Sequence, residues 1–331
     1  MSKQEFSIPS LAKTLTTETA AYLLLEKLRW GGAPEACPKC GTLGRTYFLN
    51  PANGFSRKTR TGSASERRVW KCGHCKRQFS VLTDTIFHGT KISIRTWLFV
   101  IFEFVSSKNS VSAWEISRKY SITNESAWHM LHRIREAMKR EPVASLFPAG
   151  AVVADETWIG GKPANRHRND PREQPRKSST TDRQAVFALV HKESREVRSM
   201  SVPNVRGVTL REKIEENANM ETLWLETDAS TAYTKIGEDA MDHQFVDHSA
   251  GQYKAEGGIS TNLLEGFFSQ LKRSIDGTHH HVSVAHLDRY LAQFDFLYTH
   301  ARRTDSQRMR TLLGQVAGRR LTYKPLAGSA E

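Results

Sequence analysis

The sequence predicts an α+β protein of several domains, and three observations support this prediction. All four cysteines form two C-x-x-C pairs in the first quarter of the 331-residue chain, a pattern typical of a small metal-bound β ribbon. Helical periodicity follows, up to about residue 140. From residue 150, apolar strand-like runs come first and helical runs dominate after residue 260, which indicates a mixed α/β domain.

Positive charge is unevenly distributed along the chain. The formal net charge is +13, which favours a polyanionic partner, usually nucleic acid. Residues 29–80 contain eleven lysines and arginines but two acidic residues, so most of the excess lies there. No apolar run is long enough to span a membrane, and the N-terminus lacks an apolar signal core. We therefore expect a cytoplasmic protein without a membrane partner.

The two cysteine pairs, CPKC at 37–40 and CGHC at 72–75, define a candidate metal site. Each pair places two thiolates on one tight turn, and two pairs complete the four-sulfur set that Zn²⁺ prefers. Disulfides or redox motifs are the alternative, but they suit an oxidising compartment rather than the cytoplasm. The expected ligands of one structural Zn²⁺ are Cys37, Cys40, Cys72 and Cys75.

Candidate DNA contacts lie between the cysteine pairs and beyond the ribbon. Basic residues of the polar insert either follow DNA phosphates or simply face solvent, and the sequence leaves both open. Residues 110–140 predict two helices joined by a short turn, a helix-turn-helix arrangement, although many such hairpins bind nothing. The predicted contacts are Arg57, Lys58, Arg60, Arg67, Arg68, Arg133 and Arg135.

Changes in composition divide the chain. The segment 142–150 contains two prolines between a helix and a strand, and we place the main boundary there. The expected order is a helical lead-in at 1–30, a zinc ribbon at 31–90, a helical and helix-turn-helix DNA-binding region at 91–141, a mixed α/β domain at 150–305 with a basic insert at 162–183, and a C-terminal tail at 306–331.

Three carboxylates follow buried segments of the mixed domain. AVVADETWI at 151–159 predicts a buried strand that ends near Asp155, and LWLETD repeats the pattern with Asp228. Glu265 lies on a predicted helix, where Asn262 and Lys272 share its polar stripe at about 100° per residue. Each acid alone is explained equally well as a turn cap or a solvated residue. The ordered trio favours a site for two Mg²⁺ or Mn²⁺ ions, because hard cations need oxygen ligands.

Strands that precede helices in a mixed sheet, with acids on two strands and one helix, follow the order of a ribonuclease-H-like fold. Such a trio can hold two cations about 3.5–4 Å apart, which stabilise the attacking and leaving oxygens of a phosphodiester. The mixed domain is therefore expected to be a ribonuclease-H-like catalytic domain.

Several segments resemble the zinc-ribbon branch of the DDE insertion-sequence transposases. ADETWIGGK at 154–162 is similar to the first-acid motif of that family, and TDASTAY at 227–233 is similar to the second. TNLLEGFFSQLKRSIDGTHHHVSVAHLDRYLAQFDFLYTHAR at 261–302 is similar to the third block. The resemblance extends over roughly residues 20–310, including both cysteine pairs. The basic insert at 162–183 departs from the family pattern.

The resemblance implies roles for individual residues. It implies that Asp155, Asp228 and Glu265 are the catalytic, metal-binding acids and that Asn262 and Lys272 are accessory. It also places His280 or His281 near the site, with His281 as the accessory candidate; a histidine at a helix terminus is the alternative.

The function that the resemblance implies is DNA transposition. Such a protein would act as a homo-oligomer on double-stranded DNA, binding the terminal repeats of its element and a target, and would catalyse metal-dependent strand cleavage and strand transfer. Two other functions remain open. One is a DNA-binding regulator with an inactive catalytic domain, and the other is a structure-specific nuclease that does not join strands.

Overall fold

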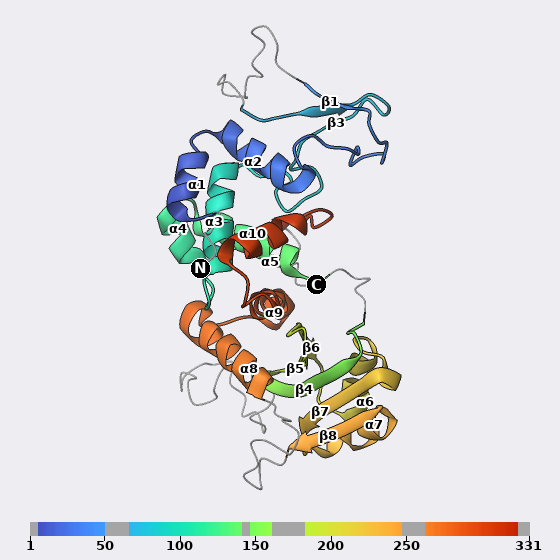
Figure 1. Cartoon of the computed structure of the whole chain (residues 1–331). Helices are drawn as coiled ribbons and strands as arrows, with labels where there is room; N and C mark the ends of the chain where they lie inside the picture. The colour runs from blue at the N-terminus through green and yellow to red at the C-terminus, as the bar shows by residue number, and fades with distance from the viewer. Residues whose placement is uncertain (1–5, 50–65, 141–145, 161–182, 247–261, 324–331) are drawn as a thin grey trace. The chain divides into compact units, whose positions relative to one another are not determined.

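The computed structural model describes residues 6–49, 66–140, 146–160, 183–246 and 262–323 (Figure 1). The chain separates into two units: Met1–Met138 with Arg302–Glu331, and Lys139–Ala301. The chain therefore enters the second unit once and returns to the first. In the described part of the chain, no helix is both long and apolar enough to cross a membrane.

A small antiparallel sheet forms the ribbon of the first unit. Its strands are β1 (Thr46–Phe48), β2 (Trp70–Cys72) and β3 (Gln78–Phe79), in the order β1-β2-β3. Trp70 is the centre of its small core: the ring of Phe48 lies 5.4 Å away and that of Trp30 lies 6.3 Å away, both edge-on. Glu26 joins the ribbon to a helix, because its carboxylate accepts from Trp70 Nε1 at 2.9 Å.

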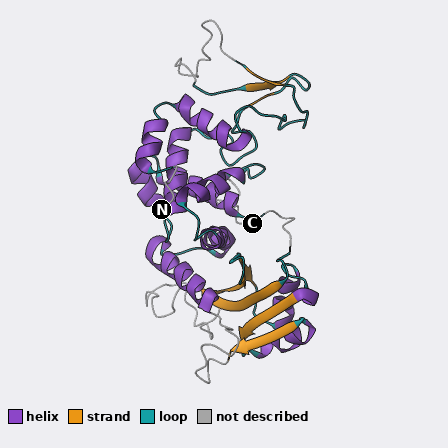
Figure 2. Ribbon diagram, viewed as in Figure 1, coloured by secondary structure: helices purple, strands orange, loops and turns teal. Residues whose placement is uncertain are grey.

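Helices make up the rest of the first unit (Figure 2). Those described are α1 (Ile8–Thr14), α2 (Glu18–Trp30), α3 (Ile94–Ser106), α4 (Ala113–Tyr120), α5 (Asn124–Met138) and α10 (Asp305–Gly314). Thr304 and Gln307 form a capping box that begins α10, and Met309, Leu312 and Leu313 bury its apolar face. Since α10 packs on α2 and α3, the first part of the segment predicted to be a C-terminal tail is a core helix of this unit.

The predicted pair of helices at 110–140 is α4 and α5, which contact each other across a short turn. Ser121 ends α4 in the left-handed conformation, with φ of 51°. None of the residues from Ala127 to Met138 is exposed, so α5 is a core helix of the unit. Glu125 in the first turn of α5 is exposed; the other exposed side chains of the two helices lie on α4, where Trp114 is 64% exposed and Arg118 is also exposed.

Burial of α5 corrects the prediction that Arg133 and Arg135 contact DNA. Arg133 donates from Nη2 to the carbonyl oxygen of His88 at 2.6 Å and lies over the ring of Trp97; burial lowers its pKa to about 10. Arg135 is 1% exposed and lies over the ring of Phe104. Neither guanidinium is available to a phosphate. The helical spacing of basic residues did not reveal which of them would be enclosed.

The second unit is built on a five-stranded mixed sheet in the order β6-β5-β4-β7-β8. Its strands are β4 (Gly150–Ile159), β5 (Gln184–His191), β6 (Val197–Val202), β7 (Leu223–Asp228) and β8 (Asp242–Val246). β4, β5 and β6 are antiparallel neighbours, whereas β7 is parallel to β4 and β8 is parallel to β7. The strand order places β4 and β7, the strands of the two predicted aspartates, side by side.

Helices cover both faces of this sheet (Figure 1). α6 (Gly207–Glu215) and α7 (Thr234–Asp239) pack on the face that includes Val152 and Ala154. α8 (Asn262–Ser274) and α9 (Val284–Thr299) pack on the face that includes Val153 and Ile159. Because side chains alternate along a strand, Asp155 belongs to the α8 face and Glu156 to the α7 face.

The edge strand β6 is closed by side chains of α9. Asp288 and Asp295 accept from the backbone nitrogens of Ser201 and Ser199 at 3.1 and 2.9 Å. Burial raises the pKa of Asp295 to about 8. These contacts occupy backbone donors that an open edge would offer to another strand. They also fix α9 against β6, on the same sheet face as α8.

Candidate metal centres

The four cysteines come together at the ribbon. Cys37 and Cys40 lie on the turn before β1, Cys72 ends β2, and Cys75 follows it; their four sulfur atoms lie within 4.8 Å of one another. The Sγ atoms of Cys37 and Cys75 are 3.8 Å apart, and those of Cys40 and Cys72 are also 3.8 Å apart. A tetrahedral site with Zn–S bonds of about 2.3 Å requires sulfur atoms about 3.8 Å apart. The donor set therefore fits one Zn²⁺.

Neighbouring groups prepare this cluster for a cation. The hydroxyl of Thr42 lies 3.3 Å from the Sγ atom of Cys40, and this hydroxyl together with the backbone of Thr42 lowers the pKa of that thiol, to about 5. The backbone nitrogen of Lys39 donates to the Sγ atom of Cys37 at 3.4 Å. Both contacts favour the thiolate form, which is the form that binds metal.

The two predicted aspartates lie on neighbouring parallel strands. Val153 of β4 pairs with Glu226 of β7, and the same register continued by two residues places Asp155 opposite Asp228. Adjacent strands are about 4.8 Å apart, so the two carboxylates lie at the same end of the sheet. Asp228 also has a local contact, because its Oδ1 atom accepts from the nitrogen of Ser230 at 3.1 Å.

Glu265 approaches from α8. Leu264 and Phe268 of that helix pack on the sheet face that contains Asp155, which brings the first turn of α8 to the strands. Burial raises the pKa of Asp155 to about 7, and the negative charges of Glu156, Asp228 and Glu265 add to this rise. The other two predicted acids, Asp228 and Glu265, therefore both act electrostatically on the carboxyl group of Asp155.

The acids do not form a closed cage. Of the residues that the structure describes, only the cysteines form a group of three or more close enough to hold a metal ion as they stand. All three acids offer the oxygen atoms that Mg²⁺ and Mn²⁺ need.

Glu156 is an acid near the site that the sequence reasoning missed. The hydroxyl of Tyr233 donates to its Oε2 atom, and Tyr233 ends the 3₁₀ turn that begins three residues after Asp228. Burial raises the pKa of Glu156, and the charge of Asp228 adds to the rise. The contact joins β4 to the loop that follows Asp228. The sequence feature that could have pointed to Glu156 is its position directly after Asp155, which makes an adjacent pair of acids.

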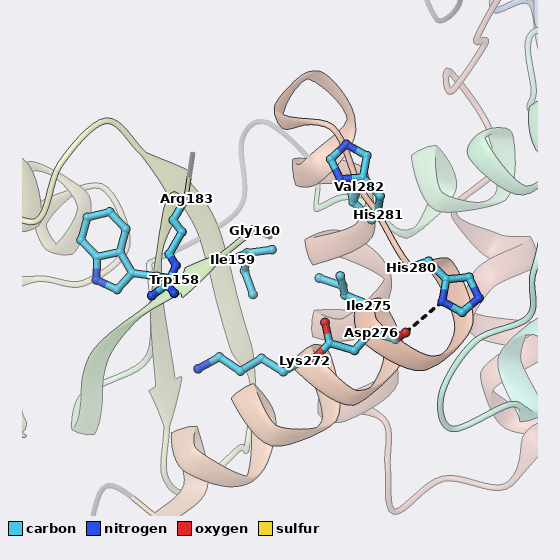
Figure 3. A pocket seen from close by; sticks show the side chains of 10 residues that line it. All are labelled: Trp158, Ile159, Gly160, Arg183, Lys272, Ile275, Asp276, His280, His281 and Val282. Atoms are coloured by element: carbon cyan, nitrogen blue, oxygen red, sulfur yellow. Dashed lines mark hydrogen bonds between the residues drawn. The ribbon is translucent and has the colours of Figure 1, made fainter. Parts of the chain in front are cut away.

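The accessory residues divide into two places. Asn262 is the first residue of α8, one turn before Glu265. Lys272 and His281 line a pocket of about 570 Å³ at the other end of this helix (Figure 3). The Nδ1 atom of the neighbouring His280 lies 3.1 Å from the carbonyl oxygen of Asp276.

The basic residues of the ribbon that were predicted to contact DNA differ in their surroundings. Arg57, Lys58 and Arg60 lie outside the described residues. Arg67 is exposed. Arg68 pairs with Glu26 at 2.8 Å and lies over the ring of Phe48, so its guanidinium already has partners inside the ribbon.

Comparison with known proteins identifies the class to which these features belong. Residues 148–299 match the ISXO2-like transposase domain, a DDE family, and residues 16–78 match the transposase zinc-ribbon domain. The chain therefore belongs to the zinc-ribbon-bearing DDE transposases of insertion sequences. It is also 23% identical over 308 residues to an uncharacterized protein in transposable element ISH50 of Halobacterium salinarum, covering 91% of this chain and 97% of that protein.

Two solved structures show weak similarity to the chain. One is a simian T-cell lymphotropic virus intasome in complex with a PP2A regulatory subunit, with 13% identity, a TM-score of 0.28, and coverage of 58% of this chain and 66% of that one. The other is a pre-cleavage Mos1 transpososome, with 8% identity, a TM-score of 0.20, and coverage of 64% and 76%. The family assignment rests on the sequence matches alone.

Proposed function

We propose that the chain is an active DNA transposase whose catalytic acids are Asp155, Asp228 and Glu265. The observation that carries the proposal is the convergence of these acids: neighbouring parallel strands supply two of them in one register, and α8 supplies the third. We further propose that the second unit has a ribonuclease-H-like fold, supported by its mixed sheet with helices on both faces.

The three acids would hold two Mg²⁺ or Mn²⁺ ions. When bound, such ions activate the attacking oxygen and stabilise the leaving oxygen of a phosphodiester. Asp155 would be one of the ligands and would give up its proton when a cation is bound. Glu156 and Tyr233 would fix the loop behind Asp228, and Asn262 would lie one turn from Glu265 on the same helix.

DNA binding is assigned to the first unit, with the terminal repeats of the element as its substrate. The ribbon contributes the exposed Arg67, and α4 contributes the exposed Arg118. If the α4–α5 pair acts as a helix-turn-helix, its contact face is on α4, since α5 is enclosed. The protein would act on DNA as a homo-oligomer.

A strand-transfer assay tests this function. Purified protein is mixed with DNA ends from its own element, a target plasmid and Mg²⁺, and the cut and joined products are resolved on a gel. Cleavage followed by joining is expected. Cleavage without joining would indicate a nuclease, and DNA binding without cleavage would indicate a regulator.

The pKa of Asp155 predicts a pH effect on the metal-free protein. Because burial and like charges raise this pKa to about 7, the unfolded state loses its proton near pH 4 while the folded state keeps it. Stability should therefore fall as pH rises from about 4 to 7. Thermal melting in EDTA measures this fall, which should be smaller in Asp155→Asn. Asp295 titrates equally in both proteins, so their difference isolates Asp155; identical pH profiles would contradict the assignment.

Lys272 lies on the same helix as Glu265, seven residues further on, and we expect it to contact a DNA phosphate. Loss of one charge-assisted contact typically costs about tenfold to a hundredfold. Lys272→Ala should reduce cleavage by that factor and leave Mn²⁺ binding unchanged, whereas Lys272→Arg should recover part of the activity. Loss of Mn²⁺ binding in Lys272→Ala would show that the polar stripe of α8 had been interpreted wrongly.

A further inference from the structure

The ribbon sheet of the first unit has an outer face that its core does not use (Figure 1). Trp70 and Phe79 lie on the inner face and are buried. The alternate residues of the strands point the other way, because side chains alternate along a strand. Tyr47 pairs with Lys71, and Lys71 pairs with Gln78, so these three side chains form one row across β1, β2 and β3.

Arg45 extends this row just before β1. Its carbonyl oxygen accepts from the backbone nitrogen of Gly73 at 2.7 Å, so the pairing of β1 with β2 continues one residue beyond the strands. A Cβ atom placed on Gly73 would lie 3.9 Å from the Cβ atom of Arg45. Since Gly73 follows Lys71 by two residues, Arg45 shares the face of Lys71. The outer face therefore consists of Arg45, Tyr47, Lys71 and Gln78.

This outer face offers hydrogen-bond donors and positive charge. Tyr47 is 46% exposed, Arg45 and Gln78 are also exposed, and Lys71 is half-buried. Within the described part of the chain, neither Arg45 nor Lys71 makes an ion pair or a side-chain hydrogen bond. None of the four residues is acidic, so the two cations are not neutralised on their own face. Such a surface is complementary to a polyanion.

Other basic residues of the ribbon are held by partners inside the protein. Arg68 pairs with Glu26 and lies over the ring of Phe48, and Lys39 pairs with Asp84 at 2.7 Å. These contacts serve the fold of the ribbon. The two cations of the outer face have no such contact among the described residues, which leaves their charge for a partner molecule.

The width of the outer face decides which part of DNA it fits. The ribbon sheet has three strands, and three strands about 4.8 Å apart occupy about 14 Å. The major groove of B-DNA is about 12 Å wide and admits a two-stranded ribbon. The three-stranded sheet is too broad to enter the groove, so its outer face meets the phosphate backbone. Arginine, lysine and tyrosine side chains all donate to phosphate oxygens.

We propose that the outer face of the ribbon docks on the phosphate backbone of double-stranded DNA. Arg45, Tyr47 and Lys71 donate to phosphate oxygens, and no base is read there. The inference rests on the proposed function, which supplies the duplex, namely the terminal repeat of the element. It adds that this face contributes affinity without sequence preference, so recognition of the repeat sequence requires other contacts of the protein.

The salt dependence of binding tests the two cations. Zinc-loaded full-length protein is titrated against a fluorescent terminal-repeat duplex at several salt concentrations, and anisotropy gives the binding constant. Loss of two phosphate contacts per chain should reduce the slope of log K against log salt by about two. Arg45→Gln/Lys71→Gln should show this reduction. Lys13→Gln/Arg95→Gln is the matched control, because both of its cations are exposed elsewhere in the unit, and its slope should not change.

The outcomes of this titration are decisive. An unchanged slope in the variant of the outer face would overturn the proposal. The reduction should be the same with a duplex of scrambled sequence, since phosphates carry no sequence. A reduction confined to the terminal repeat would show that the face reads bases and would overturn the assignment to the backbone.

Lysine acetylation, measured by mass spectrometry, tests the same face in the unaltered protein. Bound duplex should suppress acetylation of Lys71 and leave that of Lys13 unchanged. Equal acetylation of Lys71 with and without duplex would overturn the proposal. Tyr47→Phe removes one donor and should weaken binding about threefold to tenfold. Equal affinity of this variant and the unaltered protein would contradict the contact of Tyr47.

The strand-transfer assay separates this inference from the proposed function. Strand transfer by a protein whose salt slope is unchanged in the outer-face variant would overturn the role of the ribbon face alone. The expected reduction of the slope in a protein that never cuts DNA would contradict the proposed catalysis alone.

Discussion

Alanine at Asp155, Asp228 or Glu265 is expected to reduce DNA cleavage by about 10³-fold or more. We propose that one shared site takes its ligands from Asp155 in the middle of β4, Asp228 at the end of β7 and Glu265 in the first turn of α8. Residues that act as a unit show losses that do not add, so double variants should cost little more than single ones. Gel assays of strand cleavage in Mg²⁺ measure the effect.

The controls separate catalysis from binding and folding. Asp155→Asn should be nearly as damaging as Asp155→Ala, because it removes the charge and keeps the shape. Glu238→Ala, on the exposed surface of α7, should retain full activity. Binding to element ends, assigned to the first unit, should survive in every variant. Full activity in the Glu265 variant would contradict the choice of third ligand, for which Glu256, outside the described residues, is the rival.

Serine at Cys37 or Cys72 should remove one Zn²⁺ per chain and unfold the ribbon. The sheet β1-β2-β3 has a small core around Trp70, so the cation must supply much of its stability, and structural Zn²⁺ contributes on the order of 10 kcal/mol to small domains. Elemental analysis measures the metal, and hydrogen exchange over residues 66–79 measures the loss of structure.

Thr42→Val is the matched control for the zinc ribbon. It removes the hydroxyl beside Cys40 but leaves four thiols, so zinc should remain bound, with an affinity that falls more steeply at low pH. Elements of the second unit should keep their exchange protection in the cysteine variants. Retention of zinc in Cys72→Ser would contradict the four-sulfur site.

The sequence was most informative where chemistry requires fixed spacing. The paired C-x-x-C motifs predicted the cysteine cluster because each pair must occupy one turn. The positions of Asp155 and Asp228 after apolar runs predicted two strands, and both strands are present and adjacent. Here local pattern and tertiary structure agree. The end of the first strand was predicted wrongly, because β4 continues four residues beyond Asp155, to Ile159.

The sequence was least informative where contacts between distant segments decide the environment. Arg133 and Arg135 look like surface residues, but α5 becomes enclosed only after α3 and its neighbours pack around it. α10 returns to the first unit after more than 160 intervening residues. The local periodicity of hydrophobic residues carries no information about a contact between segments so far apart. The contact that fixes Glu156 comes from the hydroxyl of Tyr233, 77 positions away in the sequence.

Anomalous diffraction at the manganese edge, from crystals of the protein soaked in Mn²⁺, tests the central claim most directly. The account predicts two peaks about 3.5–4 Å apart, bounded by Asp155, Asp228 and Glu265, and their loss in Asp155→Asn. Full occupancy elsewhere in the protein, with no peak between these three carboxylates, would contradict it.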